Sequence, residues 1–170
     1  MARRAPLSFD PIAEAAANWQ RAGWAEATPG MALVTSIMRA HQILLARVDS
    51  ALAAHGLTFS RFEVLMLLDF SRSGRLPLGR IGQRLQVHPA SVTNAIDRLE
   101  AAGLVERVAH PTDGRTTLAA ITDEGRRTAR AAAAVLNDQV FTGIGIDDEH
   151  TRAVVDALGV LRANAGDFAP

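Results

Sequence analysis

The chain has no cysteine and no lysine among its 170 residues. Without cysteine it can form no disulfide, no thiolate metal site and no cysteine nucleophile. Its apolar runs stay far below the ~18 residues that a transmembrane helix needs. The N-terminus is basic at Arg3 and Arg4, but polar residues and Pro11 follow instead of an apolar core. We therefore expect no signal peptide, no membrane span and a cytoplasmic protein.

Net charge is also absent, because 18 arginines balance 18 acidic residues. The balance hides an uneven distribution along the chain. From Arg72 to Arg127 there are nine arginines and six acids, a net of +3, whereas residues 128–170 carry three arginines and six acids, a net of −3. A basic middle segment is consistent with a nucleic-acid partner, although many enzymes show similar swings.

Helical periodicity dominates both ends of the chain. The first 28 residues favour a short amphipathic helix, and a long helix is predicted from Pro29 to about His55, with Thr28 as its N-cap and Gly56 after its end. Apolar residues in the long helix are spaced 4-3-4-3-4, which fits either a core helix or a contact between subunits. This seam consists of Val34, Met38, His41, Leu45, Val48 and Leu52.

The central block predicts a specific order of elements, namely a helix, a short helix, a tight turn, a longer helix and a β-hairpin. This order is typical of a helix-turn-helix, whose second helix enters the DNA major groove. The expected helices run from Thr58 or Ser60 to about Ser71, from Leu78 to Leu85 and from Pro89 to about Ala102, and the expected strands cover 104–108 and 116–121. Beyond the hairpin, Thr122 caps a helix to about Phe141, and a last helix covers about Asp147 to Ala165.

The helix that begins at Pro89 divides into an apolar face and a polar first turn. Val92, Ala95, Ile96 and Leu99 form the apolar face. The outward residues of the first turns are small or neutral and can approach base edges closely. Asn94 fits a bidentate bond to adenine, Ser91 and Thr93 fit bases or phosphates, and Pro89 and Ala90 fit a thymine methyl.

Arginines and the hairpin tip complete the candidate DNA surface. Arg80, Arg84, Arg98 and Arg107 supply positive charge, and Arg115 at the tip of the hairpin can reach the minor groove. Asp113 is expected to hold an arginine in position, or else Asp113 and Gly114 form only a turn. The predicted DNA-binding residues are His88, Pro89, Ala90, Ser91, Thr93, Asn94, Arg80, Arg84, Arg98, Arg107 and Arg115, with Asp113 and Gly114 positioning the wing.

Five segments between residues 58 and 126 together resemble the MarR family of winged-helix regulators. They are Phe62–Leu65, Ile81–Val87, Asp97–Val105, Asp113–Arg115 and Ile121–Gly125, in the family's order and spacing. The resemblance implies a homodimer with interleaved first and last helices, two recognition helices on a pseudo-palindrome and two wings in minor grooves. The chain departs from the family at His88, a poorer cap than the usual serine or threonine, and at Gly114, where a second arginine is frequent.

The N-terminal extension resembles a subgroup of that family that carries an extra first helix and responds to urate or other organic anions. This resemblance implies a ligand pocket containing a tryptophan, an aspartate and arginines. The candidates here are Trp19, Trp24, His41, Asp69, Arg72 and Arg98. Packing tryptophans and a histidine in the core or at the dimer interface are the alternative interpretation.

We therefore expect a mainly α fold with a small β-hairpin wing, a winged helix-turn-helix joined to a helical dimerisation region. Residues 1–57 and 123–170 are assigned to dimerisation, and residues 58–122 to DNA binding. The expected function is a sequence-specific repressor, bound to double-stranded DNA as a homodimer and released by a small organic-anion or phenolic ligand. A winged-helix module for protein partners is the alternative. No enzyme, metal or cofactor is expected, because H-E-x-x-H, G-x-S-x-G and a Gly-rich phosphate loop are missing.

Overall fold

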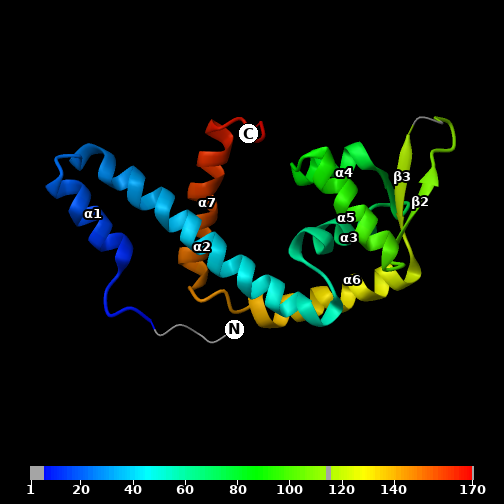
Figure 1. The fold of residues 1–170 in the computed structure, drawn as a ribbon, viewed down its shortest axis with the longest axis horizontal. Coiled ribbons are helices and arrows are strands. Elements are labelled where there is room, and N and C mark those ends of the chain that lie inside the picture. The colour runs from blue at the N-terminus through cyan, green and yellow to red at the C-terminus, as the bar shows by residue number, and fades with distance from the viewer. Residues whose placement is uncertain (1–5, 114–115, 170) are drawn as a thin grey trace. The chain divides into compact units, whose positions relative to one another are not determined.

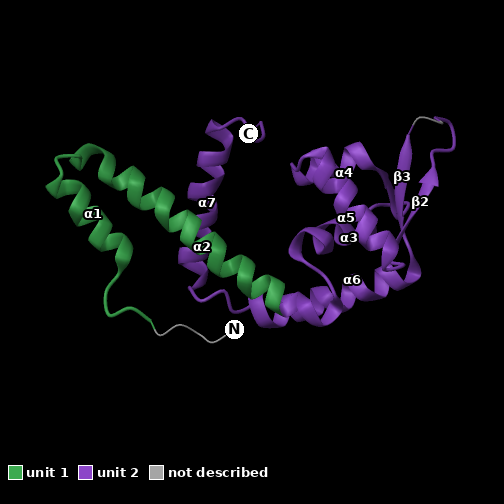
Figure 2. Ribbon diagram, viewed as in Figure 1, with its two compact units in different colours: residues 1–50 green, residues 51–170 purple. Residues whose placement is uncertain are grey.

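The computed structural model describes residues 6–113 and 116–169. The chain divides into two compact units, residues 1–50 and 51–170 (Figure 2). The first unit contains α1 (Pro11–Arg21), a 3-10 turn (Ala25–Ala27) and most of α2 (Thr28–Leu52). Asp10 caps α1 by accepting a hydrogen bond from the Ile12 N–H at 2.9 Å. The short first helix predicted from the sequence is thus confirmed.

The predicted role of Thr28 as an N-cap is wrong. The 3-10 turn runs directly into α2, so Thr28 already lies inside a helical segment. Its hydroxyl donates to the Trp24 carbonyl at 3.1 Å instead of accepting from the following turn. The other end of α2 agrees with expectation, because a 3-10 turn (Ala53–His55) ends at Gly56 in the left-handed conformation, with φ of 66°.

The second unit begins with the last two residues of α2 and contains the helix-turn-helix and its wing (Figure 1). Its remaining helices follow the wing and end the chain. The elements are α3 (Phe59–Asp69), β1 (Arg75–Pro77), α4 (Leu78–Leu85), α5 (Pro89–Ala101), β2 (Val105–Ala109), β3 (Thr117–Ile121), α6 (Asp123–Leu136), a π-helical turn (Asn137–Phe141) and α7 (Asp148–Asn164). Their bounds follow the sequence-based expectation within a few residues, so the mainly α fold with a small β wing is confirmed.

The wing contains one strand more than predicted. β2 and β3 form the expected antiparallel hairpin, but β1 pairs with the other side of β3, which gives the order β1-β3-β2. The Ile121 N–H extends this pairing by donating to the Gly74 carbonyl at 2.9 Å. The sequence suggested only an extended link here, because three residues that include Pro77 carry no strand periodicity.

The core of the second unit positions α5. Leu65 and Leu68 of α3, Ile81 of α4, and Ile96 and Leu99 of α5 are almost completely buried. Burying such a side chain contributes roughly 1.5–3 kcal/mol, so these contacts fix α5 firmly on α3 and α4. In the described part of the chain, no single helix is long and apolar enough to cross a membrane.

Candidate nucleic-acid interface

The turn before α5 is built by two unusual residues. Gln86 ends α4 in the left-handed conformation, with φ of 54°, and the Val87 N–H returns to the Gly82 carbonyl at 3.1 Å. His88 then caps α5, because its ring nitrogen Nδ1 accepts from the Ala90 N–H at 3.2 Å. The imidazole ring thus replaces a serine or threonine cap, a substitution that the sequence alone made look unfavourable.

The two faces of α5 separate as predicted. Val92, Ile96 and Leu99 are buried, and Ala95 is half-buried. Apart from Val92, the residues of the first turns are exposed, and the helix N-terminus at which they lie favours an anion. These exposed residues are Pro89, Ala90, Ser91, Thr93 and Asn94.

The four described arginines proposed to surround α5 fall into two groups. Arg80, Arg84 and Arg98 are exposed. Arg107 of β2 instead forms ion pairs with Asp97 and Glu100 of α5, and these hydrogen bonds, Asp97 first, raise its pKa above the ordinary value. Arg107 is therefore the one member of this set whose guanidinium is held between two carboxylates.

The tip of the wing is only partly described. Gly114 and Arg115, two of the predicted wing residues, lie outside the described residues. Asp113 closes the described part of the loop, because its carboxylate accepts from the Thr116 hydroxyl at 2.7 Å and its carbonyl accepts from the Thr116 N–H at 3.0 Å. Asp113 therefore has a structural role in the turn.

The residues predicted to line a ligand pocket belong to both compact units of the chain. Trp19 and Trp24 of the first unit pack edge to face, with ring centroids 5.0 Å apart. His41, on α2, is exposed, so it is not a core histidine of the single chain. Arg72 is also exposed, whereas the side chain of Asp69 is only 4% exposed. Arg126 and Arg130 of α6 bind Asp69 at 2.7 and 3.0 Å.

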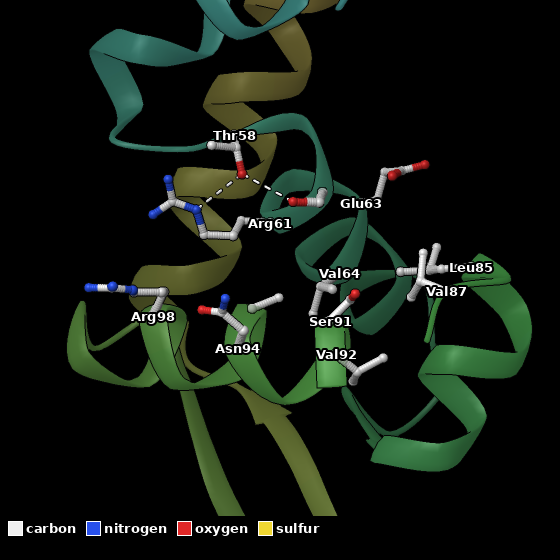
Figure 3. A pocket seen from close by; sticks show the side chains of 12 residues that line it. Thr58, Arg61, Glu63, Val64, Leu85, Val87, Ser91, Val92, Asn94 and Arg98 are labelled. Atoms are coloured by element: carbon white, nitrogen blue, oxygen red, sulfur yellow. Dashed lines mark hydrogen bonds between the residues drawn. The ribbon is translucent and has the colours of Figure 1, made fainter. Parts of the chain in front are cut away.

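A cavity of about 500 Å³ lies between α3 and α5, at a place that no sequence pattern indicated. Figure 3 shows Arg61 and Arg98 on one side of it, Asn94 next to Arg98, and Glu63 on the opposite side. Thr58 orients Arg61 by accepting from its Nε at 3.2 Å, and burial raises the pKa of the Glu63 carboxyl. Apolar side chains also line it, namely Val64, Leu85, Val87, Val92 and Ala95.

Of the candidate pocket residues from the sequence, only Arg98 lines this cavity. Arg61 and Glu63 were missed because they alternate with the core residues Phe62 and Val64 on α3. They line a cavity only because α5 packs near them, and no local sequence pattern predicts that packing. Among the described residues, no group of three or more histidine or acidic side chains could hold a metal ion.

The ion pairs of Asp69 with Arg126 and Arg130 predict that the stability of the fold depends on pH in the acid range. Hydrogen bonds from Arg130, and then from Arg126, hold the Asp69 pKa below its ordinary value against the opposing effect of burial. A carboxyl whose folded pKa is depressed stabilises the protein above its unfolded pKa of about 3.9, and this stabilisation is lost as the pH falls through the folded pKa. We expect Asp69→Asn to lower the free energy of unfolding by about 2 kcal/mol at pH 7.

Urea denaturation of both proteins at pH 7 and at about pH 3 measures this effect. The difference between wild type and Asp69→Asn should shrink at the lower pH. A difference that stays constant between the two pH values would show that the Asp69 charge contributes no stability.

The exposed polar turn of α5, the buried face beneath it and the three-stranded wing define a winged helix-turn-helix, a DNA-binding architecture. Residues 55–116 match the model of the MarR family. The crystal structure of Sco5413, a MarR family transcriptional regulator from Streptomyces coelicolor, is 49% identical; the alignment covers 84% of this chain and 99% of that one, with a TM-score of 0.75. The chain belongs to the MarR family of transcriptional regulators, which is not a family of enzymes.

Two further relatives are named by function or by ligand. The transcriptional repressor Rv2887 of Mycobacterium tuberculosis is 33% identical over 59% of this chain and 70% of its own length. CouR from Rhodococcus jostii RHA1, solved bound to p-coumaroyl-CoA, is 27% identical over 81% of this chain and 93% of its own, with a TM-score of 0.67. MhqR, a transcriptional regulator of Bacillus subtilis, is 36% identical over 52% of this chain. The match spans only 60% of the length of MhqR.

Proposed function

We propose that this protein is a homodimeric, sequence-specific repressor that a small organic-anion or phenolic ligand releases from its operator. The observation that carries the proposal is the first part of α5, where five small or polar residues are exposed while Val92, Ile96 and Leu99 on the other face are buried. In this proposal residues 58–122 bind DNA, and residues 1–57 and 123–170 hold the dimer together.

The exposed polar residues in the first turns of α5 form hydrogen bonds to DNA. Asn94 reads adenine through its amide, and Ser91 and Thr93 bond bases or phosphates. The Thr93 hydroxyl donates to the Pro89 carbonyl at 3.1 Å, so it can still accept a hydrogen bond. The exposed side chains of Arg80, Arg84 and Arg98 contact the phosphates, and Arg115 enters the minor groove.

The effector site that the geometry supports best is the cavity between α3 and α5. Its volume of about 500 Å³ lies in the range of small-molecule sites. Apolar residues can cover the ring of an aromatic acid, while Arg61 and Arg98 bind its carboxylate. Ser91 and Asn94 line the cavity and also belong to the reading surface, so ligand and DNA compete for them. The CouR complex with p-coumaroyl-CoA supports a phenolic effector.

The proposal is tested by fluorescence anisotropy on labelled DNA from immediately upstream of the protein's own gene. Random DNA serves as competitor at about 50 and 200 mM salt. We expect specific binding by two chains per site, a steep dependence on salt, and release by aromatic acids such as salicylate. Equal, weak binding to both DNAs would count against operator recognition and would favour a protein partner for the winged helix.

Asn94→Ala tests direct reading of bases. We expect it to weaken operator binding by about 1–3 kcal/mol while leaving binding to random DNA almost unchanged, because an amide that bonds a base edge discriminates between sequences. Arg84→Ala is the matched control, since Arg84 is assigned to a phosphate and its removal should weaken both complexes equally. Equal losses on the two DNAs for Asn94→Ala would show that Asn94 reads no base.

A further inference from the structure

An ion-pair cluster joins the proposed recognition helix α5 to the wing strand β2. One terminal nitrogen of the Arg107 guanidinium donates a hydrogen bond to Asp97, and the other donates one to Glu100. The main-chain N–H of the same residue donates to Glu100 Oε1 at 3.1 Å. The three side chains are 28%, 56% and 39% exposed, for Arg107, Asp97 and Glu100, so the cluster lies at the surface.

The main-chain bond has a topological reason. In the sheet order β1-β3-β2, strand β2 lies at an edge, and among the described strands it pairs with β3 alone. Edge strands leave N–H groups unpaired on their outer side. The Glu100 carboxylate satisfies one of these groups, at Arg107. The helix therefore takes the place of a further strand at this point of the wing.

The position of Asp97 creates an electrostatic problem for DNA binding. It follows Asn94 by three residues and Thr93 by four, so it lies one turn farther along the same exposed face of α5. Unshielded carboxylates on that face would repel the phosphates of a bound duplex. Arg107 places its positive charge between the two carboxylates of α5.

We propose that Arg107 is a positioning residue that fixes α5 against the wing and shields its two carboxylates, rather than a residue that contacts DNA. This role rests on the proposed function, since it concerns how α5 meets the duplex. Both terminal nitrogens of the guanidinium are occupied by carboxylates. To reach a phosphate, Arg107 would leave Asp97 and Glu100 without their cation beside the DNA.

A double-mutant cycle separates the two roles. Arg107→Ala is measured in the wild-type protein and in the variant Asp97→Asn/Glu100→Gln, whose side chains keep their shape without charge. We expect Arg107→Ala to raise the operator Kd about tenfold in the wild-type protein and less than about twofold in the neutral background. An equal or larger loss in the neutral background would overturn the proposal, because a direct phosphate contact does not depend on the carboxylates.

Arg84→Ala is the control in the same two backgrounds. Its exposed side chain is assigned to a phosphate, so the loss of affinity should be equal in both. Thermal melts verify that each variant is folded, and Arg107→Gln replaces Arg107→Ala if the alanine variant is not. The ratio of operator to random-DNA affinity is recorded throughout, because a purely structural defect would lower both affinities alike.

Amide hydrogen exchange tests the cluster without DNA. Because Glu100 is the acceptor of the Arg107 N–H, Glu100→Ala should make that amide exchange at least about tenfold faster. Unchanged exchange would overturn the proposal that Glu100 and Arg107 hold α5 against the wing. If the wild-type protein showed no preference for its operator while the amide behaved as expected, the proposed function would fail. The contact between Arg107 and Glu100 would then still be supported.

Discussion

Gly125→Ala will lower the free energy of unfolding by about 3 kcal/mol or more, although alanine usually stabilises a helix relative to glycine. Gly125 lies in the first turn of α6, where a helix former would be expected to help. A Cβ atom at this position would lie 2.0 Å from the Leu104 carbonyl oxygen and 2.8 Å from Ile121 Cγ1. The steric clash therefore reverses the sign that helix propensity predicts.

The clash cannot be relieved by a small local movement. The Leu104 carbonyl accepts from the Thr122 N–H at 3.1 Å. The Thr122 hydroxyl in turn donates to the Gly103 carbonyl at 2.8 Å and accepts from the Gly125 N–H at 3.0 Å. Moving Leu104 away from a new methyl group would break its bond to the Thr122 N–H and would disturb the bond of the neighbouring Gly103 carbonyl to the Thr122 hydroxyl. These two bonds tie the residues that follow α5 to the start of α6.

Urea denaturation measures the change, with Gly79→Ala as the control. Gly79 is also helical, in α4, but a Cβ there meets nothing within 4 Å. The control should be neutral or stabilised by up to about 1 kcal/mol. If both variants gained stability, the close approach of α6 to the Leu104 carbonyl would be wrong.

The reason for glycine at position 125 could not be predicted from the sequence. Gly125 belonged to a segment that resembles the MarR family, yet nothing local explained why glycine stands there. The reason is a carbonyl that precedes it by 21 residues along the chain. The helices themselves were predictable, because apolar spacing, Pro89 at the start of α5 and Gly103 after its end are local features.

Other parts of the site depend on contacts between distant segments. Arg126 and Arg130 follow Asp69 by 57 and 61 residues, so no local pattern in the sequence links them to it. Arg107 follows Asp97 by ten residues across a change from helix to strand, and it looked like one more free cation. Charge can be counted from a sequence, but the pairing that neutralises it depends on tertiary structure.

Met38→Glu is expected to convert the proposed dimer into a monomer and to weaken operator binding at least about 100-fold. Val34 and Met38 lie on the predicted seam of α2 and are 57% and 62% exposed in the single chain. Monomeric proteins rarely leave such a series of apolar side chains uncovered, so we propose that a second copy covers them. A glutamate there would be buried without a partner, and two linked half-sites would no longer be bound together.

Light scattering coupled to size-exclusion chromatography gives the mass, and anisotropy on the same samples gives the operator affinity. Ser36→Glu is the matched control, because it adds the same charge to an exposed position of α2 outside the seam. It should remain dimeric and bind normally. If Met38→Glu also remained dimeric with full affinity, the seam would not be the interface. The exposed apolar residues of α7, including Val155 and Val160, would then be the next surface to test.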